Sequence, residues 1–130
     1  MTHETQTAAE IIALERAALD RWGKGDPSGY LEISAPEVTY FDPYLAHRLD
    51  GHPALTNWYA PLRGSMHIDH YEMISPKVQL AGDMAVLTFN LVSYSGTQAM
   101  DWNSTEVYRR TPQGWRIVHT HWSITQHLEG

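Results

Sequence analysis

The sequence predicts a single α+β domain spanning residues 1–130, and three observations lead to that prediction. The chain has 130 residues, a length typical of one domain that buries about two thirds of its unfolded surface. Its first half contains a long run with helical hydrophobic spacing, and its second half contains four runs rich in β-forming residues. Helices followed by successive strands indicate an α+β plan with an antiparallel sheet.

The first predicted element is a helix that begins near Thr7. Thr7-Ala-Ala-Glu10 fits a capping box, in which a hydroxyl and a carboxylate satisfy the first backbone N–H groups. Apolar residues then recur at helical spacing: Ile11, Leu14, Ala18 and Trp22. The glycines at 23 and 25 end this helix, and a short second helix is expected over Ser28–Ile33.

A short strand and a third helix follow. Val38–Phe41 is rich in β-formers and ends at Asp42-Pro43, which predicts a strand that enters a turn. The segment Asp50–Pro53 is expected to open a helix, because proline suits the first helical turn. Its apolar face comprises Leu55, Trp58, Tyr59 and Leu62.

The second half predicts an antiparallel meander of four strands. The β-rich runs are Tyr71–Leu80, Met84–Tyr94, Trp102–Arg110 and Trp115–Thr125. Pro76 lies inside the first run and therefore predicts an edge strand or a bulge.

Composition argues against several kinds of partner. The formal charge is −6 and the nine Lys and Arg residues are not clustered, so nucleic acid is not an expected partner. The absence of cysteine excludes disulfides and thiolate chemistry. No apolar run approaches the roughly 20 residues that span a bilayer. The polar, acidic first ten residues lack a signal-peptide pattern, so we expect a cytoplasmic protein without membrane contact.

Strand alternation predicts one polar face in the sheet. If Arg110 pairs with Trp115, then Glu106 lies opposite His119; if Tyr94 pairs with Trp102, then Asn90 lies opposite Glu106. The face would gather Asn90, Tyr94, Trp102, Ser104, Glu106, Tyr108, His119 and His121. A slip of one residue would scatter this group.

Glu106 and His119 are candidate acid–base residues on that face, since a carboxyl beside an imidazole can exchange protons with a ligand. The alternative is that they only complete a buried hydrogen-bond network. Together with His121 they resemble a two-histidine, one-carboxylate metal set, but the spacing is not diagnostic, so we expect no metal and no cofactor. His121 is expected to be a scaffold residue that borders the pocket.

Asp42 is the second candidate, because it follows an apolar strand and precedes a proline. It either caps a turn or accepts protons at the mouth of a pocket. The chain also has five Trp and seven Tyr, which suit half-wet cavities and interfaces. We expect the walls of a pocket to comprise Tyr40, Trp58, Tyr59, Tyr94, Trp102 and Tyr108.

Four segments of the chain carry a resemblance to known proteins: GKGDPSGYLEISAPEVTYFDP, NWYAPLRG, GDMAVLTFNLVSY and TEVYRRTPQGWRIVHTHWS. They resemble the nuclear transport factor 2-like superfamily, especially SnoaL-like proteins and the association domain of calcium/calmodulin-dependent protein kinase II. The resemblance covers about Ala9 to Ser123. It implies a cone-shaped barrel in which a strongly curved antiparallel sheet wraps the first helix, a pocket at the open end, and assembly into a homodimer or larger ring.

The resemblance also bears on individual residues. Asn90 and Glu106 stand where the kinase association domain has pocket arginines, so a preference for anions is not expected. In ketosteroid isomerase, a relative, Asp42 would match the general base and Glu106 the protonated second acid. Ala18 stands where that enzyme has its oxyanion-binding tyrosine, so steroid-type isomerisation is not expected unless another tyrosine substitutes.

Two functions follow, and the sequence leaves open whether the protein is an enzyme. In the first, the cone binds a small, fairly apolar organic molecule, with Asp42 as the base and Glu106 with His119 as its partner, which allows isomerase-, dehydratase- or hydrolase-like chemistry. In the second, the chain is a non-catalytic oligomerisation module with a subunit contact formed by Val118, Trp122 and Ile124.

Overall fold

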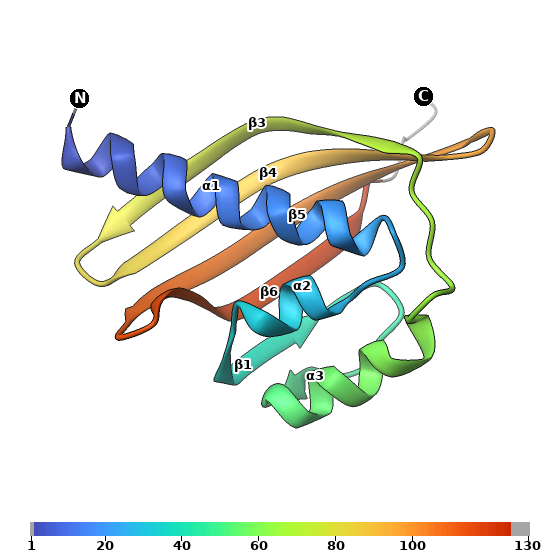
Figure 1. Ribbon diagram of the computed structural model, residues 1–130, viewed down its shortest axis with the longest axis horizontal. Coiled ribbons are helices and arrows are strands. Elements are labelled where there is room, and N and C mark those ends of the chain that lie inside the picture. The colour runs from blue at the N-terminus through green and yellow to red at the C-terminus, as the bar shows by residue number, and fades with distance from the viewer. Residues whose placement is uncertain (1, 126–130) are drawn as a thin grey trace.

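A six-stranded sheet curls around the long helix α1 in the computed structural model, which describes residues 2–125 (Figure 1). The helical elements are α1 (His3–Trp22), α2 (Ser28–Glu32), α3 (His52–Tyr59) and the 3₁₀ helix η1 (Ala60–Leu62). The strands are β1 (Ser34–Phe41), β2 (Leu49–Asp50), β3 (His70–Ala81), β4 (Met84–Ser95), β5 (Gln98–Thr111) and β6 (Gly114–Ile124). The predicted α+β class is confirmed, and the predicted elements occur in the predicted order; β2 and η1 were not predicted.

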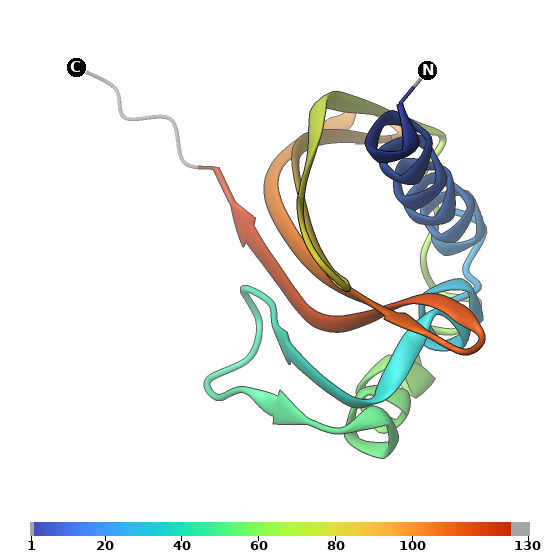
Figure 2. The ribbon, with the colours of Figure 1, turned by 90° about the vertical axis from the view of Figure 1, so that its left-hand side faces the viewer.

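The sheet has the strand order β2-β1-β6-β5-β4-β3. Neighbouring strands are antiparallel except for β1 and β6, which run parallel, so the sheet is mixed. The sheet is strongly curved but not closed, and β2 and β3 are its edge strands. Figure 2 shows α1 along the concave side, with α3 beside β1 and β2. The concave side therefore belongs to the core, and the convex side is the outer face.

Helix α1 begins earlier than the capping box predicts. Its N-cap is Thr2, whose hydroxyl accepts a hydrogen bond from the backbone N–H of Thr5. Thr7 lies inside the helix and is buried, so the predicted start was wrong by one helical turn. Within residues 2–125, no helix is both long and apolar enough to cross a membrane.

The turn after α1 brings two glycines into contact. Gly25 has φ +81°, and a Cβ there would lie 3.1 Å from the Cα of Gly64. The backbone N–H of Gly64 donates to the carbonyl of Gly25, and that of Ile68 donates to the carbonyl of Gly23. Because glycine tolerates both the positive φ and the close approach, the segment between η1 and β3 is fixed across the end of α1.

Strand β3 has the irregularity that Pro76 predicts. It is an edge strand, and its register against β4 shifts between Ile74 and Lys77. Ser75 takes a positive φ of 51° at this bulge. The proline therefore lies where a missing backbone donor costs no ladder hydrogen bond.

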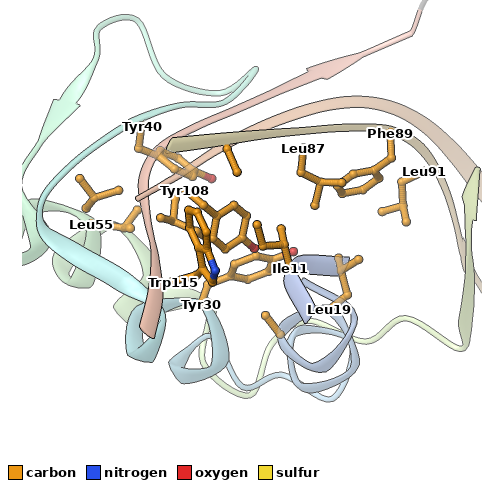
Figure 3. Packing of buried hydrophobic residues seen from close by; sticks show 14 of the residues in the cluster. Ile11, Leu19, Tyr30, Tyr40, Leu55, Leu87, Phe89, Leu91, Tyr108 and Trp115 are labelled. Atoms are coloured by element: carbon orange, nitrogen blue, oxygen red, sulfur yellow. The ribbon is translucent and has the colours of Figure 1, made fainter. Parts of the chain in front are cut away.

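The core lies between α1 and the concave face of the sheet (Figure 3). Ile11 of α1 and Leu87 of β4 are fully buried. Aromatic residues make up much of the rest, and the labelled examples are Tyr30, Tyr40, Phe89, Tyr108 and Trp115. Several of these rings carry a hydroxyl into the interior, which has to be hydrogen-bonded there.

Candidate functional site

A cavity of about 590 Å³ opens between the end of α1, the strand β1, the helix α3 and the ends of the central strands. Eight aromatic side chains line it: Trp22, Tyr30, Tyr40, Tyr44, Trp58, Tyr59, Trp102 and Trp122. Edge-to-face contacts join six of them, with ring centroids 4.9 Å apart for Trp22 and Tyr59 and 6.0 Å apart for Trp102 and Trp122. The walls are therefore mainly apolar, with hydroxyl and indole N–H groups among their polar edges.

Asp42 lies half-buried in this cavity at the end of β1. Its Oδ2 accepts hydrogen bonds from the Tyr40 hydroxyl (2.9 Å) and from the indole N–H of Trp58 (3.0 Å). Its Oδ1 accepts from the backbone N–H of Tyr44 (2.8 Å). The residue thus caps a turn, and its carboxylate also lines the cavity. Its role as a proton acceptor stays a prediction.

Among the other residues predicted to bind a ligand, Tyr40, Trp58, Tyr59 and Trp102 line the cavity. Asn90, Tyr94, Tyr108 and His121 do not line it. Sequence reasoning left out four aromatic residues that line it: Trp22, Tyr30, Tyr44 and Trp122. Trp22 belongs to the apolar stripe of α1, which is typical of core, and no local pattern marked the other three as cavity residues.

The predicted pairing of Glu106 with His119 was wrong because β6 contains a bulge. Arg110 pairs with Trp115 as predicted, but the register shifts between Tyr108 and Val107, and Val118 is left without a cross-strand partner. Glu106 therefore pairs with Thr120 rather than with His119. One extra residue reverses the face of every later side chain.

His119 and His121 consequently lie on the outer face, away from Glu106. The Nδ1 atom of His119 is 2.7 Å from the hydroxyl of Thr39, and both imidazoles contact Phe41. Partial burial lowers the pKa of His119. The two histidines and Glu106 thus do not converge, and the alternative of a metal set built from them is not supported. Trp122 lies on the face opposite to the histidines, in the cavity wall, which does not favour the predicted subunit contact through it.

The predicted pairing of Asn90 with Glu106 was wrong as well. Strand β5 begins at Gln98, so Leu91 pairs with Trp102 and Asn90 pairs with Asn103. The side-chain Nδ2 of Asn90 donates to Oδ1 of Asn103 (2.7 Å). Strands β4 and β5 extend through polar residues almost to the turn. Sequence reasoning assigned those polar residues to a longer loop.

Glu106 instead forms a buried pair with Glu15 of α1, and both side chains have zero exposed area. Glu15 accepts hydrogen bonds from the hydroxyls of Tyr30 (2.5 Å) and Tyr108 (2.7 Å). Oε2 of Glu106 accepts from the hydroxyl of Thr120 (3.3 Å). Sequence reasoning missed Glu15, although it is four residues after Ile11 and four before Leu19 and therefore lies on the apolar stripe of α1.

The pKa values of both carboxyls in this pair are raised, with burial as the largest cause. Burial, followed by the charge of Glu15, raises the pKa of Glu106 well above its usual value. Burial raises the pKa of Glu15 to about 6, while the hydrogen bonds from its partners oppose the rise. Among residues 2–125, no group donates a hydrogen bond to Oε1 of Glu106. A protonated Glu106 resolves this, because it then donates to the Glu15 carboxylate.

The acid pair does not line the cavity but lies directly behind its wall. Tyr30 connects the two, since its ring lines the cavity and its hydroxyl bonds Glu15. Burial raises the pKa of the Tyr40 and Tyr59 hydroxyls above the usual value, so both stay protonated hydrogen-bond donors. Of the three predicted catalytic side chains, the cavity wall contains Asp42, while Glu106 lies behind the wall and His119 lies outside it.

The fold and this site define a cone-shaped α+β protein of the nuclear transport factor 2-like class, with an aromatic cavity inside the cone. The family model of the calcium/calmodulin dependent protein kinase II association domain matches residues 7–126. The chain belongs to that family.

Solved structures give the same fold. A ketosteroid isomerase-like protein from Parabacteroides distasonis is 43% identical over 92% of this chain and 88% of its own, with a TM-score of 0.83. A nuclear transport factor 2-like protein of unknown function from Pseudomonas putida is 25% identical over 96% of this chain and 91% of its own, with a TM-score of 0.83. The C. elegans kinase II association domain is 20% identical over 92% and 97%, with a TM-score of 0.78. A search of the curated proteins finds no match.

Proposed function

We propose that the protein binds a small, largely apolar organic molecule in the aromatic cavity, oriented by Asp42. The cavity itself carries the proposal: about 590 Å³ of space lined by eight aromatic side chains and one carboxylate. Sites for small molecules have volumes of roughly 300–1,000 Å³, with mainly apolar walls and a few fixed polar groups. Asp42 is such a fixed polar group, because hydrogen bonds from Tyr40, Trp58 and the Tyr44 backbone hold it in place.

Asp42 is also the group in this cavity best placed to accept a proton from a bound molecule. The Tyr40 hydroxyl, 2.9 Å away, can donate to the ligand or to the carboxylate. We assign Glu106 an indirect role, through Glu15 and Tyr30, because it does not reach the cavity. Turnover would thus begin with proton transfer to Asp42, in line with the 43% identical isomerase-like relative.

Narrowing the cavity is expected to abolish binding. Met66 lines the cavity, is half-buried and lies in the segment before β3, so Met66→Trp would fill space without disturbing the buried core. Three aromatic probes serve as ligands: benzyltrimethylammonium, 2-methyl-1-phenyl-2-propanol and phenylacetate. We expect at least one to bind, with Met66→Trp weakening its affinity by about tenfold or more in a calorimetric titration.

Met84→Trp is the matched control, because Met84 is 37% exposed at the β3–β4 turn and does not line the cavity. Its affinities are expected to equal those of the wild type. Failure of all three probes to bind the wild type at millimolar concentration would contradict the proposed function.

Self-association is the second candidate function, and the outer face of the sheet favours it. Val86 and Val107 are paired across strands β4 and β5 there, and Ile74 on β3 is 40% exposed. This face, rather than the side of Trp122, would form the contact between copies. Membership of an association-domain family points the same way.

A charge on this face is expected to break the assembly. Val107→Glu would place a carboxylate in the middle of the apolar contact, which has a large desolvation cost. Sedimentation velocity should show a dimer or larger species for the wild type and a smaller one for the variant. Gln6→Glu adds the same charge at an exposed position of α1, away from this face, and should leave the species unchanged. A monomeric wild type at high concentration would rule out this function.

A further inference from the structure

The chemistry of the cavity wall limits which molecules it can accept. The cavity-lining residues within 2–125 include one formally charged side chain, Asp42, and no Lys, Arg or His. No ion pair neutralises Asp42 among those described residues, since its partners are two neutral side chains and a backbone N–H. The protein as a whole has a formal charge of −6, which adds a negative field over longer distances. A negative ligand would therefore be repelled, and a positive one attracted.

Asp42 retains capacity for one more partner. A carboxylate offers about four acceptor positions. The Tyr40 hydroxyl and the Trp58 indole N–H use two on Oδ2, and the Tyr44 backbone uses one on Oδ1. The remaining position is on Oδ1, so a positive centre can approach the carboxylate without breaking the contacts that hold it.

The aromatic walls add a second attraction of the same sign. Four of the five tryptophans line the cavity, together with four tyrosines. The face of an aromatic ring carries negative charge density and attracts cations, with tryptophan the best partner. Ring faces of this kind suit tertiary and quaternary ammonium groups. A primary ammonium is strongly hydrated and has three N–H donors that each need an acceptor, so it loses more on entering a mainly apolar cavity than a quaternary ammonium does.

We propose that the natural ligand of the cavity is a tertiary or quaternary ammonium compound with an attached apolar or aromatic group, whose positive centre sits beside Asp42. This inference rests on the proposed function and specifies the ligand class. The apolar part of the ligand fills the cone toward Leu91 and Trp102, where the wall has no charge.

The three probes test this directly, because they share a benzyl group and differ mainly in charge. Quenching of tryptophan fluorescence is a suitable readout, given the four tryptophans in the wall. We expect benzyltrimethylammonium to bind about tenfold or more tightly than the neutral alcohol, and phenylacetate to bind most weakly. Raising the salt concentration from about 50 mM to about 500 mM should weaken binding of the cation more than that of the alcohol.

Asp42→Asn should weaken binding of the cation by about tenfold or more while changing the affinity for the alcohol by less than about threefold. Retained binding of the alcohol shows that the variant is folded. Asp83→Asn is the matched control, since it removes the same charge at the exposed β3–β4 turn, outside the cavity.

The two proposals fail in different ways. If no probe binds the wild type, the proposed function fails. If the alcohol or phenylacetate binds as tightly as the cation, or if Asp42→Asn leaves the affinity for the cation unchanged, the cavity remains a ligand site and the ammonium assignment is overturned.

Discussion

Glu106→Gln is expected to make the protein more stable than the wild type at pH 8, by roughly 2 kcal/mol. Glu106 is fully buried, and its pKa is well above the usual value because of burial and the neighbouring Glu15 charge. A glutamine amide can donate to Glu15 as the protonated acid does, and it needs no proton. The variant therefore keeps the hydrogen bond and loses the electrostatic penalty.

The sign follows from the raised pKa values. When a folded-state pKa lies above the unfolded value, stability is fully present below the unfolded pKa and is lost as pH rises through the folded one. For Glu15 the stability is lost between pH 4.5 and about pH 6. For Glu106 the loss extends to higher pH. The loss approaches about 1.4 kcal/mol per pH unit for each proton concerned. Glu106→Gln should flatten the curve above pH 6.

Urea unfolding at pH 5 and pH 8 measures both effects. Glu10→Gln is the control, because it makes the same substitution at an exposed position of α1; its pH dependence should match the wild type. A Glu106→Gln variant less stable than the wild type at pH 8 would show that Glu106 is needed as a carboxylate.

Ile11→Ala is expected to cost about 2–5 kcal/mol of the free energy of unfolding. Ile11 has zero exposed area and lies where α1 meets the concave face of the sheet (Figure 3). Removing three carbons there leaves a cavity that the surrounding rings cannot fill, because packed interiors relax only in part. Loss of this much stability would threaten a domain whose total is typically 5–15 kcal/mol.

The neighbouring residue provides the matched comparison. Ile12→Ala removes the same atoms from a half-buried position on the same helix, so its cost should be distinctly smaller. Thermal and urea unfolding of the two variants measure the difference. Equal losses in the free energy of unfolding would mean that α1 stabilises the domain through helix propensity rather than through packing on the sheet.

The elements of this fold could be predicted from the sequence because their signals are local. The stripe through Ile11, Ala18 and Trp22 defined α1, and Pro76 marked the bulge on an edge strand. Asp42 could be singled out because a strand followed by Asp-Pro places a carboxylate at a strand end. These patterns involve neighbours within a few residues, where backbone geometry dictates the outcome.

Register was not accessible in the same way. The bulge that leaves Val118 unpaired has no distinctive residue, yet it separates Glu106 from His119 and places Trp122 in the cavity. The residue pattern of a strand looks the same with or without a bulge, but every side chain beyond the bulge lies on the opposite face of the sheet.

The sequence by itself determined the helices α1 to α3, every strand except β2, their order and the carboxylate at the end of β1. Only the tertiary structure decided which side chains meet: Glu15 with Glu106 across 91 residues of chain, here counted from their numbers, and the aromatic rings that surround Asp42. The physical reason is that burial and charge coupling depend on distances in space, and those are set by strand register and by the curl of the sheet around α1 rather than by any local pattern.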